Sequence, residues 1–174
     1  FRRLADALGL LFDTRYASTN PTAASQYIYH MLAAASSASY LMLPNIAATL
    51  FLKLGDYSKS MGALDNARTF FEYALNVLKN NFESSKPILL TIHQKLAEIN
   101  KAQKNLHGAR ASYEKALRIA TSMYHASHPN VAGLEHELGQ ILLLIGDHDS
   151  AATHLQKAYD IESHKDNDLP IDES

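Results

Sequence analysis

Small and apolar residues return at the same positions along most of the chain, with a 42-residue period. Ala67, Ala109 and Ala151 mark this 42-residue interval. Each is followed four residues later by a large side chain and seven residues later by a second alanine. These positions are Phe71, Tyr113 and Leu155, and then Ala74, Ala116 and Ala158. A spacing of three, four and seven residues places side chains on one face of an α-helix, so the pattern predicts a helical repeat.

A second pattern precedes each of these segments by twelve residues. There a small residue follows a leucine, in the pairs Leu54-Gly55, Leu96-Ala97 and Leu138-Gly139. Small residues on one helix, opposite alanines and a large side chain on the next, indicate two helices whose backbones cross closely. Each 42-residue unit is therefore predicted to be a helical hairpin.

Turn residues separate the two helices of each predicted hairpin. Gly62-Ala63-Leu64-Asp65 and Gly146-Asp147-His148-Asp149 occupy this place in the first and third full copies. Glycine there suits a left-handed residue at the end of a helix. The middle copy has Lys104-Asn105-Leu106-His107, and we expect Asn105 to take the left-handed conformation in that turn.

Prolines mark where helices are expected to begin. Pro44, Pro87 and Pro129 stand ten or eleven residues before the small residue of each copy. Proline is favoured in the first turn of a helix, where its missing N–H has no partner to lose. We therefore expect each of these three prolines to open the first helix of a hairpin.

The repeats divide a single predicted domain, residues 1–174, into one degenerate unit and three full ones. The degenerate unit covers 1–47, and the full units cover 48–89, 90–131 and 132–173. In the degenerate unit, Pro21 is expected to open the second helix after a loop at residues 15–20, and residues 169–171 could begin a further helix. The predicted fold is all-α, a right-handed α-solenoid of stacked antiparallel helix hairpins.

Composition and charge limit the possible functions. The net charge is −2 with both signs mixed, which provides no basic field for nucleic acid or an anionic membrane. The chain has no cysteine, which excludes a disulfide framework and fits a reducing compartment, so a cytoplasmic location is expected. No apolar run reaches the roughly 18 residues that span a bilayer, so no membrane insertion is predicted. Since Phe1 rather than methionine stands first, we expect the chain to be part of a longer protein.

Nine histidines raise the question of a metal or catalytic site. His125 and His128 flank a turn with a spacing that zinc could use, but no cysteine accompanies them and His128 belongs to a helix-opening pattern. His148, His154 and His164 are scattered along a helix of surface type. No catalytic triad order, phosphate-binding glycine loop or paired carboxylate motif is found. We predict no enzyme activity, no metal and no cofactor.

The succession Leu-Gly, Gly-Asp and Ala-x3-aromatic-x2-Ala-Leu resembles the signature of the tetratricopeptide repeat (TPR) superfamily. An ordinary TPR has a shorter repeat, of about 34 residues. The 42-residue form, with His128-Pro129-Asn130-Val131-Ala132 opening a helix, is similar to the extended repeats of the kinesin light chain group. The resemblance implies a TPR-like superhelix whose first helices line a concave groove that holds a partner peptide or helix, and thus a protein–protein interaction scaffold.

Charged residues recur at the positions that this resemblance turns toward the groove. Lysine and acidic residues alternate there at the same phase in the first two full repeats, and the third repeat places polar residues on the same face. The candidate partner-binding residues are Lys53, Asp56, Lys59, Lys95, Glu98, Lys101, His136 and Gln140. Two lysine rows beside an acidic row would suit a peptide of alternating charge or one with carboxylates. Alternatively, these charges are solvated and form weak pairs along their own helices.

Two further functions remain open. Peptide-holding TPR domains place asparagines or a lysine and asparagine set on their first helices, whereas this chain has Leu52-Lys53, Gln94-Lys95 and His136-Glu137 there. Because the chain is expected to be part of a longer protein, it could be a helical accessory domain of a larger enzyme, as in SET and MYND type methyltransferases. It could also be a self-associating structural solenoid.

Overall fold

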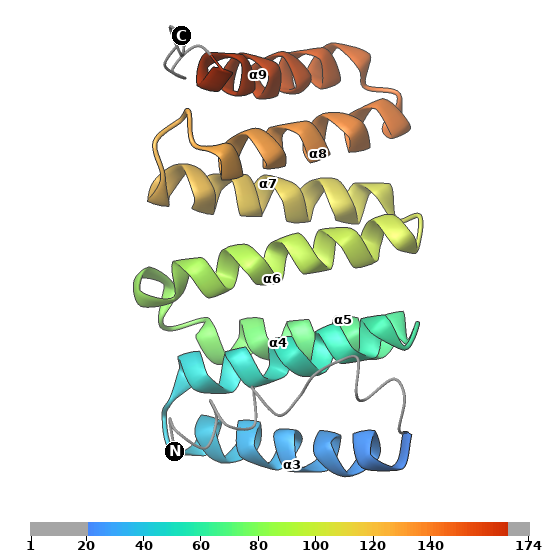
Figure 1. Cartoon of the computed structure of the whole chain (residues 1–174), viewed down its shortest axis with the longest axis vertical. Coiled ribbons are helices and arrows are strands. Elements are labelled where there is room, and N and C mark those ends of the chain that lie inside the picture. The colour runs from blue at the N-terminus through green and yellow to red at the C-terminus, as the bar shows by residue number, and fades with distance from the viewer. Residues whose placement is uncertain (1–20, 167–174) are drawn as a thin grey trace, which may run out of the picture. The chain divides into compact units, whose positions relative to one another are not determined.

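The computed structural model describes residues 21–166, with side chains from 28 to 163, and all regular secondary structure in this range is α-helical. The helices are α3 (Pro21–Tyr40), α4 (Pro44–Ser60), α5 (Leu64–Leu78), α6 (Phe82–Ala102), α7 (Leu106–Met123), α8 (Pro129–Ile145) and α9 (His148–Asp166) (Figure 1). The predicted all-α class is confirmed. The expected loop at 15–20 and helix start at 169–171 lie outside the described residues.

The chain divides into two compact units, Phe1–Lys95 and Leu96–Ser174, whose boundary falls within α6. Unit 1 contains α3, α4, α5 and the first part of α6. Unit 2 contains the end of α6 together with α7, α8 and α9. These two units do not test the predicted repeat boundaries, 1–47, 48–89, 90–131 and 132–173, which stay a prediction.

In unit 1 the α4–α5 hairpin closes around one glycine. Phe71 of α5 is fully buried, as are Leu54, Ala67 and Ala74. A Cβ atom added to Gly55 would lie 2.3 Å from Cε1 of the Phe71 ring. The ring thus occupies the space that a side chain at position 55 would need, which confirms the close helix crossing predicted from the repeat.

In unit 2 the same positions form the cores of the hairpins. Ala109, Ala116, Ala151 and Ala158 are all buried. A Cβ atom added to Gly139 would lie 2.7 Å from Cγ of Leu155, so α8 and α9 also cross closely at a glycine. Because alanine and glycine have almost no side chain, two helix backbones can approach at these points.

The prolines behave as predicted at three sites and differently at one. Pro44 and Pro129 stand at the start of α4 and α8, and Pro21 begins α3. Pro87 does not open a helix, because α6 begins at Phe82 and contains the proline inside it.

The additional turn of α6 before Pro87 is stabilised by side chains. The hydroxyl of Ser85, which is fully buried, donates a hydrogen bond of 2.6 Å to Oδ1 of Asn45 at the start of α4. Lys86 and Glu83 form an ion pair of 2.7 Å within the turn. These contacts offset the one backbone hydrogen bond that a proline inside a helix removes.

The turn within the middle hairpin also differs from the prediction. Gly62 and Gly146 have positive φ angles of 74° and 92°, as expected. In the middle copy it is Lys104 that has a positive φ, 58°, and not Asn105. Asn105 instead caps α7, with its side chain accepting a hydrogen bond of 3.1 Å from the N–H of Gly108. Lys104 lies 42 residues after Gly62 and 42 before Gly146, so it holds the left-handed position of the repeat, and Asn105 occupies the cap position that follows.

Candidate partner-binding site

The unit 1 part of the predicted site lies on α4 and α6. Lys53, Asp56 and Lys59 follow one another at intervals of three residues on α4 and are all half-buried. Nζ of Lys95, on α6, lies 3.0 Å from Oδ1 of Asp56. Lys53 and Lys59 each have an interaction of their own as well. The structure therefore joins α4 and α6 through two residues that the sequence predicted on one face.

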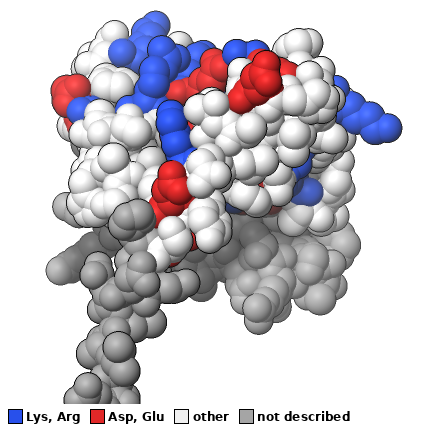
Figure 2. Space-filling view, turned by 90° about the horizontal axis from the view of Figure 1, so that it is seen from above, with Lys and Arg blue, Asp and Glu red and all other residues white. Residues whose placement is uncertain are grey.

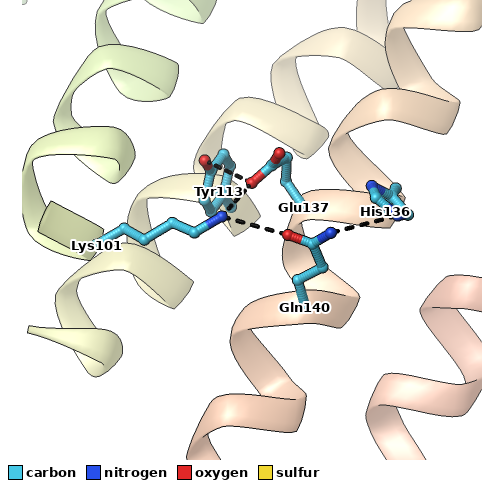
Figure 3. A network of polar contacts seen from close by, with 5 residues as sticks. All are labelled: Lys101, Tyr113, His136, Glu137 and Gln140. Carbon is cyan, nitrogen blue, oxygen red and sulfur yellow. Dashed lines mark hydrogen bonds and ion pairs between the residues drawn. The ribbon is translucent and has the colours of Figure 1, made fainter. Parts of the chain in front are cut away.

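The unit 2 part of the site lies where the end of α6 meets α8. Nζ of Lys101 donates hydrogen bonds of 3.0 Å to Oε2 of Glu137 and 3.3 Å to Oε1 of Gln140 (Figure 3). Lys101 and Gln140 were both predicted site residues. Two first-helix side chains that lie one helical turn apart in the repeat, 39 residues apart in sequence, thus come into direct contact within this unit.

A buried tyrosine extends this network into the core. Tyr113, on α7, is almost completely buried, and its hydroxyl donates a hydrogen bond of 3.2 Å to Oε2 of Glu137. Burial raises the pKa of Tyr113, and the negative charge of Glu137, its hydrogen bond and the charge of Glu98 raise that pKa further. The phenol therefore remains a neutral donor over the physiological pH range.

Gln140 carries the network to the surface. Since its carbonyl oxygen accepts from Lys101, its amide nitrogen is directed toward Nε2 of His136, at 3.4 Å. His136 is exposed, whereas Glu98 and Gln140 are half-buried. A chain of polar groups thus runs from buried Tyr113 to exposed His136, and Figure 3 shows these side chains converging between the helices.

Glu137, on the inward face of the third repeat, and Tyr113 were not among the site residues predicted from the sequence. Tyr113 occupies the large position of the repeat, where unit 1 has Phe71, and was assigned only to packing. The hydroxyl is the signal that could have revealed the network, because a buried tyrosine needs a hydrogen-bond partner. A glutamate one turn before Gln140 on the facing helix is able to supply it.

The ion pairs Lys95–Asp56 and Lys101–Glu137 each join different helices. All four side chains are partly exposed. Neither pair follows the spacing along one helix that the alternative interpretation assumed. Each such pair contributes about 0–1 kcal/mol to stability through its charges, whereas Glu137 also accepts the hydrogen bond of the buried Tyr113 hydroxyl. Figure 2, seen from above, shows basic and acidic side chains lying among one another on the surface in view.

Two further histidines of unit 2 have contacts that bear on the question of a metal or catalytic site. Within residues 21–166, no three histidine, cysteine, aspartate or glutamate side chains gather as a metal site would require. His128 caps α8, with Nδ1 accepting a hydrogen bond of 3.1 Å from the N–H of Asn130, as its helix-opening position predicted. His154, expected on the surface, is half-buried and its Nδ1 contacts the carboxylate of buried Glu135.

None of the helices in the described region combines the length with the apolar character that a bilayer crossing needs.

Comparison with known proteins gives a family and two similar structures. The family model for the tetratricopeptide repeat matches residues 45–122 and 91–162. The crystal structure of BtubC (BKLC) from P. vanneervenii is similar with a TM-score of 0.70 and 15% identity, over 86% of this chain and 61% of BtubC. That of MamA is similar with a TM-score of 0.56 and 16% identity, over 88% of this chain and 86% of MamA. A search of curated proteins finds no match.

Proposed function

The chain belongs to the tetratricopeptide repeat family, and from that premise we propose that it binds a peptide or helix of a partner protein along the face of the first helices in each of its two units. The family supports, in general terms, a role in protein–protein interaction. The proposed face carries Lys53, Asp56, Lys59 and Lys95 in unit 1, and Glu98, Lys101, His136 and Gln140 in unit 2. We place this activity in the cytoplasm and propose that it involves no catalysis.

One observation carries the proposal. In each unit, a polar side chain of one first helix reaches a polar side chain of the next, as in the Asp56–Lys95 and Lys101–Gln140 contacts. The face is consequently lined with hydrogen-bonding groups that are partly exposed and contribute little to stability. Charged groups in such positions govern association rate and partner choice more than fold.

Exchange of a charge pair tests the proposal without removing an interaction. The double variant Asp56→Lys/Lys95→Asp keeps the net charge and can re-form the ion pair in the opposite direction. We expect at least about tenfold weaker binding of a partner that was first identified by affinity capture, because the charge order on the face is inverted. The measurement is a titration by isothermal calorimetry, with circular dichroism to verify the fold.

The matched control is the exchange Arg110→Glu/Glu114→Arg, which inverts an ion pair of 2.8 Å on α7, outside the proposed face. Partner binding should survive this change. If both exchange variants bound the partner equally well, the proposal that this face binds the partner would be wrong. Light scattering of the chain alone addresses self-association, which would appear as a mass that doubles with concentration.

A further inference from the structure

An aromatic residue recurs at the connection that leads into the first helix of three successive repeats. Tyr40, Phe82 and Tyr124 follow the 42-residue period and precede or begin α4, α6 and α8. This position lies at the edge of the repeats, away from the face proposed above. The three aromatic side chains can therefore be compared at one place in the repeat.

The aromatic residue of unit 2 is covered. The Tyr124 ring stacks on the His128 ring with the centroids 4.1 Å apart and the planes inclined by 15°. Tyr124 is consequently only half-exposed. Contact with the His128 ring therefore covers part of the Tyr124 ring within unit 2.

The two aromatic residues of unit 1 are much less covered. Phe82 has Nζ of Lys86 at 5.7 Å from its ring centroid, and 48% of Phe82 is still exposed. Tyr40 is 88% exposed, and its neighbours Leu41 and Met42 are 46% and 87% exposed. We call these four residues, Tyr40, Leu41, Met42 and Phe82, the apolar edge.

The members of the apolar edge lie at the same end of unit 1. The Ser85–Asn45 hydrogen bond of 2.6 Å joins the first turns of α6 and α4. Phe82 and Met42 each stand three residues before a partner in that bond. The α3–α4 and α5–α6 connections accordingly lie on the same side of the unit, on the left in Figure 1.

The conformation of Met42 presents its side chain to solvent at some cost. Its φ angle is 56°, in the left-handed region where glycine is strongly preferred. The turn is closed by hydrogen bonds from the N–H of Met42 to the carbonyl of Ser39 and from the N–H of Leu43 to the carbonyl of Ala38, at 3.2 and 2.9 Å. Glycine would serve this turn with less strain, so folding alone does not account for an exposed methionine here.

The charged residues around the apolar edge indicate what kind of partner surface would fit it. The sequence has no charged residue between His30 and Lys53, so the α3–α4 connection is apolar and uncharged. Around Phe82, the exposed Lys79 and the Lys86–Glu83 pair provide two positive charges against one negative charge. A partner that fits would bring an apolar face with a carboxylate beside it.

We propose that the apolar edge is a second docking site, which binds an amphipathic helix of a partner protein whose apolar face is flanked by carboxylates. Aromatic and methionine side chains are enriched where proteins bind one another, and exposed groups of them mark such sites. The carboxylate would meet Lys79. The site does not depend on the face of α4, α6 and α8, and either site can fail without the other.

A synthetic 18-residue helix tests this directly. The probe has leucines on one face and glutamates along both flanks, and binding is followed by fluorescence anisotropy. We expect the triple variant Tyr40→Ala/Met42→Ala/Phe82→Ala to bind the probe at least about tenfold more weakly, since burial of three large side chains is lost. Lys79→Glu should weaken binding several-fold, and this loss should shrink at high salt.

The matched control is Tyr124→Ala, which removes the covered aromatic residue at the same position of the repeat and should leave probe binding unchanged. Because the three edge residues are exposed, the triple variant should unfold at an unchanged temperature, and Phe82→Ser alone provides a second test. Undetectable binding of the probe to the unaltered chain would overturn the proposal, as would equal binding by the triple variant. Equal binding of a lysine-flanked helix, or tighter binding of phosphatidylcholine/phosphatidylserine vesicles, would also overturn it.

Discussion

The α4–α5 hairpin of unit 1 and the α8–α9 hairpin of unit 2 occupy the same positions of the repeat but are closed by different side chains. At the helix crossing, Gly55 faces the fully buried ring of Phe71, whereas Gly139 faces Leu155, which is half-buried. At the N-terminus of the second helix, Ala63 makes no side-chain cap. The corresponding Asp147 accepts a hydrogen bond of 3.2 Å from the N–H of Ser150. A repeat therefore keeps its backbone geometry while it allows the contacts that stabilise each copy to change.

The largest difference between the hairpins should appear at the two glycines. Gly55→Ala would drive Cβ into a rigid buried ring, at 2.3 Å, so we expect a loss of about 2–3 kcal/mol in the free energy of unfolding. Gly139→Ala places Cβ 2.7 Å from Cγ of Leu155 and 3.3 Å from the carbonyl oxygen of Ala151, but Leu155 is half-buried and can shift, so we expect a smaller loss of about 1–2 kcal/mol. Urea denaturation measures both. Adding Phe71→Leu to Gly55→Ala should recover stability, and no recovery would contradict the proposed clash.

The second largest difference should be the stability lost when the acidic partner of each unit's ion pair is removed. Glu137→Ala leaves the buried hydroxyl of Tyr113 without its acceptor, so a loss of about 1–3 kcal/mol is expected. Asp56→Ala removes only a partly exposed pair and should cost about 0–1 kcal/mol. Thermal unfolding compares these variants. In the Tyr113→Phe background the effect of Glu137→Ala should shrink, and an unchanged effect would show that the hydroxyl is not responsible.

A smaller effect of opposite sign is expected at the turns. Lys104 takes the left-handed position that Gly62 and Gly146 take in the other hairpins. Lys104→Gly should therefore raise the free energy of unfolding by about 0.5–1 kcal/mol through relief of backbone strain. Gly146→Lys is the reciprocal change and should lower it. If both substitutions lowered stability, backbone strain at Lys104 would not be the controlling factor.

The smallest effect should be the pH dependence of the stability that Asp147 gives to the N-terminus of α9. Hydrogen bonds from the side chain and backbone of Ser150 lower the pKa of Asp147, and Arg110 adds to this. A carboxyl group whose pKa is lowered in the folded state stabilises above its ordinary pKa of about 3.9, and this contribution is lost as the pH falls through the folded-state value. The protection of the first amides of α9 against hydrogen exchange, expressed relative to the intrinsic rate at each pH, should therefore fall below about pH 4. Asp147→Ala should abolish this dependence, while α5, which begins after Ala63, serves as the internal reference.

Much of the fold could be predicted because the 42-residue pattern repeats the same physical requirement. Ala67, Ala109 and Ala151 have to be small wherever two helices cross, so their spacing indicated each hairpin. The errors concern competition between local preferences. Asn105 suits both a left-handed turn and a helix cap, and Pro87 suits a first turn, although the Ser85–Asn45 contact extends α6 before it.

The candidate site could be predicted only in part. Periodicity predicted Asp56, Lys95, Lys101 and Gln140 on one face, and the contacts Asp56–Lys95 and Lys101–Gln140 join residues 39 apart, about one helical turn less than the 42-residue period. The connection from Lys101 through Glu137 to buried Tyr113 required knowledge of where the hydroxyl points. Likewise, the apolar residues Tyr40 and Phe82 share a repeat position, but the sequence does not indicate how much of each is exposed.

The sequence by itself determined the all-α class, the hairpin unit and the positions where helices cross, because small residues and periodic apolar faces act locally or between neighbouring elements. Only the tertiary structure decided which polar groups meet, which residue takes the strained conformation in each turn, and which of the repeated aromatic residues remains uncovered. The reason is physical. Backbone packing depends on residue size at regular spacing, whereas hydrogen bonds and exposed surface depend on the positions of individual atoms on several helices at once.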